Sequence, residues 1–198
     1  MQILRIDSAT TGVNSVSRIL TQAITDHLTA KHPEATLIQR DLVTDPLPHI
    51  DAAATGAIRL PQDSHDEAMA AAFPAERAVL DQFLASDIVV IGAPMYNFTI
   101  PSQLKAWLDR LGVPGVTFTY KDGAPQGLAG GRRVIVASSR GGAYEMGGTA
   151  EHQETLLRDF FAFIGIPDVE FVRAEKTGFG PEARDQAIAD ARARVAGL

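Results

Sequence analysis

The run Ile88-Val89-Val90-Ile91 consists only of β-branched apolar residues, and Gly92-Ala93-Pro94-Met95-Tyr96-Asn97-Phe98 follows it directly. A strand that is apolar at every position has to be buried on both of its faces. Such strands are typical of parallel sheets, which helices cover on both sides. The run therefore predicts a central strand of an α/β domain, with an aromatic loop at its carboxyl end.

Strands and helices alternate on both sides of this run. Short apolar runs predict further strands over 3–6, 36–38, 134–137 and 169–172. Apolar residues at helical spacing predict helices over 15–31, 101–111, 151–164 and 181–195. This alternation predicts a single domain, 1–198, with a five-stranded parallel sheet covered by helices on both faces. The expected fold is doubly wound and flavodoxin-like, with strand order 2-1-3-4-5.

Two segments, at about 43–86 and 112–130, are longer than such a fold requires. Prolines at 46, 48, 61 and 74 predict that the first is a loop with short helices. The second alternates Val116, Phe118 and Tyr120 before a Lys121-Asp122-Gly123 turn, which predicts an extended or hairpin segment. Extra elements of this kind often form a pocket wall or a subunit contact.

Composition excludes several classes of protein. The chain has no cysteine, which excludes disulfides, thiolate catalysis and cysteine-ligated metals, so any redox chemistry has to reside on a bound cofactor. A net charge of -6 argues against a nucleic-acid partner. We expect no membrane span, no metal site and no secretory signal, and hence a cytoplasmic protein.

Ligands of open α/β sheets bind beyond the carboxyl ends of the strands, and the loop after the first strand suits a phosphate. Residues 8–17 are small and polar and lead directly into a helix. A helix N-terminus offers free N–H groups, to which Ser15 and Ser17 could add hydroxyl donors. The alternative is an ordinary helix cap at Asn14 or Ser15. The chain has neither a GxxxxGK[ST] nor a GxGxxG motif.

Two later loops at the same edge also have unusual compositions. The stretch 93–101 holds Met95, Tyr96 and Phe98 between two prolines, which predicts a rigid wall for a flat apolar ring. The alternative is that these aromatic residues pack beneath the next helix. In Ser139-Arg140-Gly141-Gly142 the glycines would let the backbone approach a ligand closely. The alternative here is a plain strand-to-helix turn.

Motifs along nearly the whole chain resemble the FMN-dependent NADH:azoreductase family, the flavodoxin-like quinone and azo reductases. They are Pro94-Met95-Tyr96-Asn97-Phe98, Ile100-Pro101-Ser102-Gln103-Leu104-Lys105, Gly115-Val116-Thr117-Phe118, Ser139-Arg140-Gly141-Gly142 and Phe163-Ile164-Gly165-Ile166. The resemblance implies a homodimeric oxidoreductase with one non-covalent FMN per subunit. Such an enzyme passes hydride from NADH or NADPH through FMN to small aromatic azo compounds and quinones, by a ping-pong mechanism.

The resemblance also implies the residues that bind FMN. The phosphate would lie on Ser15, Val16 and Ser17, with Ser8 or Ala9 nearby. The flavin ring would lie against Pro94, Met95, Tyr96, Asn97 and Phe98 and be held by Ser139, Arg140, Gly141 and Gly142. The family often has a second serine where this chain has Ala9, so one hydroxyl contact would be absent or supplied by Thr10.

Four aromatic residues are candidates for the apolar walls of the substrate pocket, some of them reaching in from the partner subunit, although any could be a core residue. They are Phe118, Tyr120, Phe160 and Phe161. No acid or base catalyst is expected, because the hydride chemistry belongs to FMN. Two alternatives share the fold. One is a flavodoxin-type electron carrier, and the other is a general NAD(P)H:quinone or FMN reductase with little azo activity.

Overall fold

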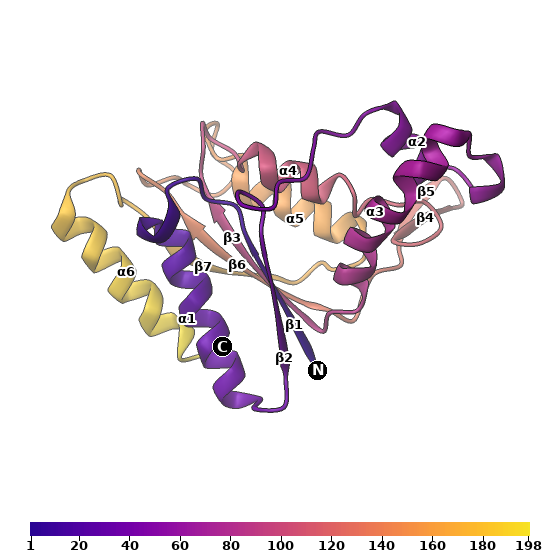
Figure 1. The fold of residues 1–198 in the computed structure, drawn as a ribbon. Helices are drawn as coiled ribbons and strands as arrows, with labels where there is room; N and C mark the ends of the chain where they lie inside the picture. The colour runs from indigo at the N-terminus through magenta and orange to yellow at the C-terminus, as the bar shows by residue number, and fades with distance from the viewer.

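The computed structural model describes residues 1–198, which form an α/β domain around one parallel sheet (Figure 1). The sheet has five strands in the order β2-β1-β3-β6-β7. Their bounds are β1 Gln2–Asp7, β2 Thr36–Asp41, β3 Ile88–Pro94, β6 Arg133–Ser139 and β7 Val169–Ala174. All four pairings are parallel, so the five carboxyl ends lie along one edge.

Strand β3 forms the middle of the sheet, and all seven of its residues are buried. Its side chains alternate between two hydrophobic cores. Ile88 and Val90 face one side of the sheet, while Val89 and Ile91 face the other. This burial on both faces confirms the prediction made from the apolar β-branched run.

Helices cover both faces of the sheet (Figure 1). Helices α1 (Val16–Lys31) and α6 (Pro181–Val195) pack side by side on one face. Helices α3 (Glu67–Leu84), α4 (Ser102–Leu108) and α5 (Gln153–Phe163) lie on the other. None of the helices combines the length and the apolar character that crossing a membrane would take.

The segment 43–86 differs from its prediction. It contains α2 (Ala52–Arg59), the 3₁₀ turn η2 (Gln62–Ser64) and the long helix α3. Pro74 lies inside α3 and does not end it. Proline removes one N–H donor from a helix. Pro74 and Ala70, four residues before it, are both exposed, so water can bond the carbonyl that is left without a partner. Helix α3 is also the crossover from β2 to β3.

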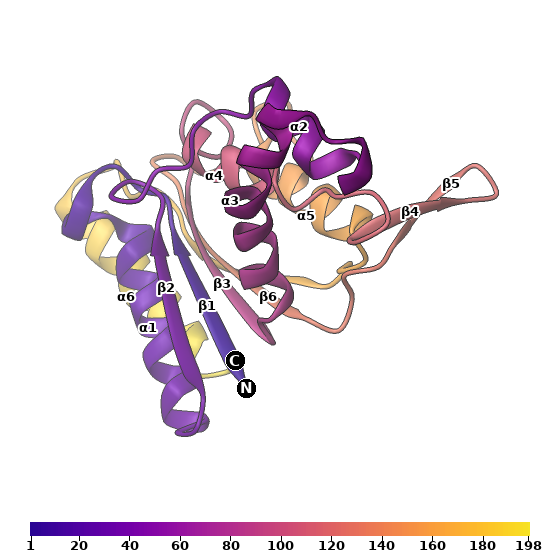
Figure 2. The same cartoon turned by 45° about the vertical axis from the view of Figure 1, so that its right-hand side comes forward.

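The segment 112–130 contains the predicted hairpin, formed by β4 (Phe118–Lys121) and β5 (Ala124–Gly127). Asp122 and Gly123 connect the strands, and both have positive φ, as the tightest hairpin turns require. The hairpin projects away from the body of the domain (Figure 2). It is a separate two-stranded sheet. The structure therefore numbers seven strands, and the five of the parallel sheet lie in the order β2-β1-β3-β6-β7, in which β6 and β7 are the fourth and fifth strands of that sheet along the chain.

A substitution at Phe83 tests how α3 packs on the sheet. Its side chain has no exposed surface, and its ring lies edge to face with Trp107, with centroids 6.0 Å apart. We expect Phe83→Ala to lower the free energy of unfolding by about 3–5 kcal/mol, measured by urea denaturation. Phe179→Ala, at a side chain that is 67% exposed, serves as the control and should change it by less than about 0.5 kcal/mol. Equal losses would contradict this assignment of the core.

Candidate functional site

A cavity of about 360 Å³ lies at the carboxyl edge of the sheet, a volume within the range of small-molecule sites. The loops after β1, β3, β6 and β7 all contribute to it. Its lining consists of Thr11, Asn14, Ser15, Val16, Pro94, Met95, Tyr96, Ser139, Gly141 and Thr177. The three loops that the sequence singles out therefore meet at one place.

The first loop presents the N-terminus of α1 to this cavity. Ser15 caps the helix, and its Oγ lies 3.0 Å from the Oγ of Ser17. The N–H groups of Val16 and Ser17 have no acceptor within the protein. The first turn contains no acidic residue, so the protein itself supplies no anion to the positive end of the helix. This arrangement suits a phosphate.

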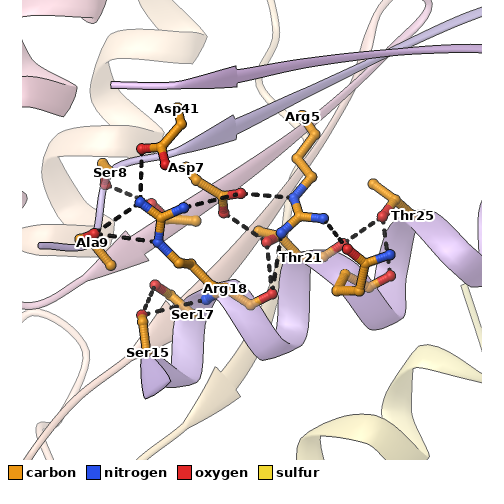
Figure 3. A network of polar contacts seen from close by, with 12 residues as sticks. Arg5, Asp7, Ser8, Ala9, Ser15, Ser17, Arg18, Thr21, Thr25 and Asp41 are labelled. Carbon is orange, nitrogen blue, oxygen red and sulfur yellow. Dashed lines mark hydrogen bonds and ion pairs between the residues drawn. The ribbon is translucent and has the colours of Figure 1, made fainter. Parts of the chain in front are cut away.

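Four charged side chains lie behind the first loop (Figure 3). Arg18 donates from Nη2 to Oδ1 of Asp41 at 2.7 Å, and from Nε and Nη2 to the carbonyl oxygen of Ala9 at 3.3 and 3.0 Å. Arg5 donates from Nε to Oδ2 of Asp7 at 2.8 Å. The hydrogen bond between Arg18 and Asp41 raises the pKa of Arg18 and lowers the pKa of Asp41. Both are therefore ionised at pH 7.

The second loop is a tight turn with an unusual backbone. The N–H of Tyr96 donates to the carbonyl of Thr99 at 2.8 Å, and the N–H of Thr99 donates back at 3.2 Å. The two residues between them, Asn97 and Phe98, have φ angles of 48° and 73°. This left-handed region is strained for phenylalanine. The turn leaves Phe98 52% exposed, with its ring edge to face with Tyr144 at a centroid distance of 6.4 Å.

Hydrogen bonds tie the first three loops to one another. The hydroxyl of Tyr96 accepts from the N–H of Thr10 at 3.0 Å and lies 2.9 Å from the Thr10 hydroxyl. The N–H of Met95 donates to the carbonyl of Ser139 at 2.8 Å. The cavity is thus held in shape by the protein before any ligand enters.

The third loop is anchored by Arg140, whose side chain turns away from the cavity and is 1% exposed. Its Nη2 lies 3.0 Å from Glu151 and 2.8 Å from Glu154, and its Nε donates to Gln153 at 2.9 Å. The carbonyl of Arg140 accepts from the N–H and the hydroxyl of Thr177. The guanidinium is therefore occupied within the protein, and Arg140 supports the cavity through the path of its backbone.

Gly141, next to Arg140, contributes only backbone to the cavity wall. A Cβ built on Gly141 would meet no atom within 4 Å, so a ligand can lie directly against its backbone. A Cβ on Gly142 would instead approach the ring of Tyr144 to 3.2 Å. The two predicted glycines thus have different surroundings, and only Gly141 lines the cavity.

The predicted cofactor residues divide into three groups. Those that line the cavity are Ser15, Val16, Pro94, Met95, Tyr96, Ser139 and Gly141. Those that are buried behind the lining are Ser8, Ala9, Ser17 and Arg140. Those that stand beside it are Asn97, Phe98 and Gly142. The hydroxyl of Ser8 donates to the carbonyl of Gly92 at 2.6 Å.

The four predicted substrate-pocket aromatics do not line this cavity. Phe161 is a core residue without exposed surface, which corresponds to the alternative of a core residue. It lies on the face of α5 that packs on the sheet. Phe118 is buried against Phe163, with ring centroids 4.4 Å apart. Phe160 is half-buried, and Tyr120 is 67% exposed on the hairpin.

Sequence reasoning missed Thr177, Tyr144 and two polar residues of the first loop, Thr11 and Asn14. Thr177 follows β7, and the rule that ligands lie beyond the carboxyl ends of parallel strands applies to that loop as well. Tyr144 lies two residues past Gly142. Only its contact with Phe98 distinguishes it, and that contact appears only in the folded chain.

A second cavity, of about 450 Å³, lies between the two long segments. Residues of α2 and α3 line one side of it, and the stretch 113–116 lines the other. Its wall includes the buried ion pair of Arg110 and Glu76, in which Nε lies 2.7 Å from Oε2. Both extra segments therefore contribute to one surface feature, as their unusual length suggested.

A doubly wound parallel sheet with a cavity and an open helix N-terminus at its carboxyl edge defines the flavodoxin-like class of α/β domains. The chain belongs to this family: the family model described as having a flavodoxin-like fold matches residues 1–198. The resemblance to the FMN-dependent quinone and azo reductases is also confirmed, because relatives of that description align along the whole chain.

Two curated relatives are named FMN-dependent NADH:quinone oxidoreductase. The one from Ralstonia nicotianae is 49% identical over 198 residues, which cover 98% of this chain and 95% of that protein. The one from Methylocella silvestris is 52% identical over 194 residues, which cover 96% and 95%. Both relatives therefore match this chain over nearly their full length.

Solved structures of azoreductases share the fold. The crystal structure of the azoreductase AzrA is 27% identical, covers 100% of this chain and 98% of its own, and gives a TM-score of 0.91. An FMN-dependent NADH-azoreductase from Bacillus anthracis, solved in complex with FMN, is 26% identical, covers 100% and 97%, and gives a TM-score of 0.86.

The carboxylate of Glu151 makes stability depend on pH. Burial opposes its ionised form, but hydrogen bonds from Glu154 and Thr155, together with the charge of Arg140, outweigh burial and lower its pKa. A carboxyl whose pKa is lower in the folded than in the unfolded chain stabilises the fold above about pH 4.3, and this contribution is lost as the pH falls further. We therefore expect the free energy of unfolding to fall between pH 5 and pH 3.

Glu151→Gln should reduce the slope of that fall and cost about 1–3 kcal/mol at pH 7, because the donors around it lose a charged acceptor. Urea denaturation at a series of pH values measures both effects. Glu182→Gln makes the same change of charge at an exposed residue of α6 and is the control. An unchanged slope in Glu151→Gln would show that this carboxylate does not carry the pH dependence.

Proposed function

We propose that this protein is an FMN-dependent oxidoreductase that transfers hydride from NADH to quinones and azo compounds. The observation that carries the proposal is the cavity that joins a free helix N-terminus to a rigid aromatic loop. Quinones are supported as acceptors because relatives near 50% identity are named FMN-dependent NADH:quinone oxidoreductase. NADH is available in the cytoplasm, and we place the enzyme there.

The residues of the cavity fit FMN. The free N–H groups of Val16 and Ser17, with the hydroxyls of Ser15 and Ser17, would hold the phosphate. The flat ring would lie against Pro94, Met95 and Tyr96, which the bonds to neighbouring loops hold in place. The exposed backbone of Gly141 would lie beside the ring, with Ser139 at its edge.

When bound, FMN would supply the two-electron hydride chemistry between donor and acceptor. The protein provides a surface on which flat molecules can stack. Phe98 and Tyr144 form an exposed aromatic pair beside the cavity, and we assign them to this role. Donor and acceptor would occupy the same position in turn, which gives ping-pong kinetics. Backbone groups of the third loop would orient the ring.

A homodimer is part of the proposal. The hairpin projects from the domain and carries Tyr120, which is 67% exposed (Figure 2). The two long segments also line the 450 Å³ cavity. We propose that these segments form the subunit contact, and that Tyr120 and Phe160 help to close the substrate pocket across it. Each subunit would bind one FMN.

The visible spectrum tests the cofactor and the donor together. Protein purified with FMN should be yellow, and anaerobic NADH should bleach it. Adding a benzoquinone or methyl red should then restore the colour. We expect the quinone to be turned over faster than methyl red, because the relatives near 50% identity are named quinone oxidoreductases. Protein that takes up no FMN would overturn the proposal, and bleached protein that neither acceptor restores would favour an electron carrier instead.

Size-exclusion chromatography tests the assembly. The dimer should elute at about twice the 21.2 kDa of the chain. Tyr120→Asp places a charge on the exposed hairpin and should shift the elution toward the monomer if the hairpin lies in the contact, because a buried unpaired charge is costly. Phe179→Asp is the control, because Phe179 is also 67% exposed but lies before α6, away from the hairpin. A wild-type protein that elutes as a monomer would contradict the dimer.

A further inference from the structure

Helix α1 carries a cation where helices normally place an anion. Acidic side chains stabilise the first turn of a helix, because the N-terminus bears a partial positive charge. Here the first turn has no acid, and Arg18 occupies its third position after the cap residue Ser15. The backbone N–H of Arg18 donates to the Oγ of Ser15 at 3.4 Å, so Arg18 adjoins the place proposed for the phosphate.

Two carboxylates lie beneath the same loop. Asp7 and Asp41 are the last residues of β1 and β2 and are direct partners in the register of the sheet. Asp7 is buried and Asp41 half-buried. Without cations nearby, their charges would repel a phosphate at the start of α1. Arg5 pairs with Asp7, and Arg18 pairs with Asp41 and lies 3.9 Å from Asp7. The four charges sum to zero.

Two hydroxyls of the first loop, those of Ser8 and Thr10, already make hydrogen bonds within the protein. The hydroxyl of Ser8 donates to Gly92, and the hydroxyl of Thr10 is bonded to Tyr96. Ala9 has no hydroxyl. Its carbonyl oxygen, which would also repel a phosphate, is instead held by two N–H groups of Arg18 (Figure 3). Arg18 thus engages both the carboxylate and the carbonyl that would oppose an anion here.

We propose that Arg18 is a positioning residue for the FMN phosphate: it neutralises Asp41 and turns the Ala9 carbonyl away, so that a phosphate dianion can lie on the N-terminus of α1. This inference rests on the proposed function, because it requires FMN as the ligand. It predicts that Arg18 distinguishes FMN from riboflavin, which has the same ring but no phosphate. A purely structural role would affect the two ligands equally.

The test is titration of the full-length apoprotein with FMN and, separately, with riboflavin, followed by the quenching of flavin fluorescence. Arg18→Gln should weaken FMN binding by about tenfold, as expected for the loss of one charge near a helix terminus. Riboflavin binding should change by less than about twofold. Arg18→Gln combined with Asp41→Asn restores a neutral cluster and should recover most of the lost affinity for FMN.

Asp41→Asn alone should change FMN affinity in the opposite direction. This test leaves Arg18 in place, so its result does not depend on whether Arg18→Gln is stable. The cluster then carries one net positive charge, so FMN should bind several-fold more tightly, by about 1 kcal/mol or less on the scale of such charge effects, and riboflavin should bind as before. Arg133→Gln is the matched control. Arg133 forms a similar pair with Glu170, at 2.6 Å, but at the amino end of β6, and its loss should leave both ligands unaffected.

Three results would overturn the inference. They are equal weakening of FMN and riboflavin in Arg18→Gln, no recovery in the double variant, and weaker FMN binding in Asp41→Asn. These outcomes differ from a failure of the proposed function, in which the unaltered protein would bind neither flavin. Circular dichroism of each variant establishes that it is folded before the titration is made.

Discussion

The site depends on the parallel sheet, because parallel pairing brings the carboxyl ends of all five strands to one edge. The loops after β1, β3, β6 and β7 then have to lie close together, although they are far apart in the sequence. Hydrogen bonds between them complete the arrangement: Tyr96 bonds Thr10, Met95 bonds Ser139, and Thr177 bonds Arg140. The cavity is therefore a property of the fold, and the loops decide which ligand it accepts.

Two arginines hold these loops from behind. Arg18 holds the first loop through the Ala9 carbonyl, and Arg140 is buried with two carboxylates beneath the third. In both cases carboxylates of the surrounding protein offset the charge of the arginine. A buried ion pair of this kind adds little net stability compared with apolar packing, but it fixes geometry, because losing one partner leaves the other unpaired. The protein thus uses ionic clusters beneath a cavity whose lining is largely uncharged.

Much of the framework followed from local patterns. The central strand was predictable because all of its side chains are apolar, and helix 181–195 was predicted with the bounds that α6 has, because glycine precedes it and proline begins it. Other features depend on tertiary surroundings. Pro74 fits inside α3 because that face of the helix meets water. Phe161 was a candidate because it is aromatic, and Arg140 was placed by its motif, yet packing in the folded chain decides where each side chain points.

The turn at Asn97 and Phe98 has a consequence for the evolution of the protein. Phenylalanine at a φ of 73° destabilises the fold, and glycine at the same position would relieve the strain. Selection for heat resistance alone would therefore favour losing this ring. If Phe98 has the stacking role proposed above, selection for turnover would favour keeping it exposed beside the cavity. A lineage adapting to high temperature has to resolve this conflict by gaining stability elsewhere in the molecule.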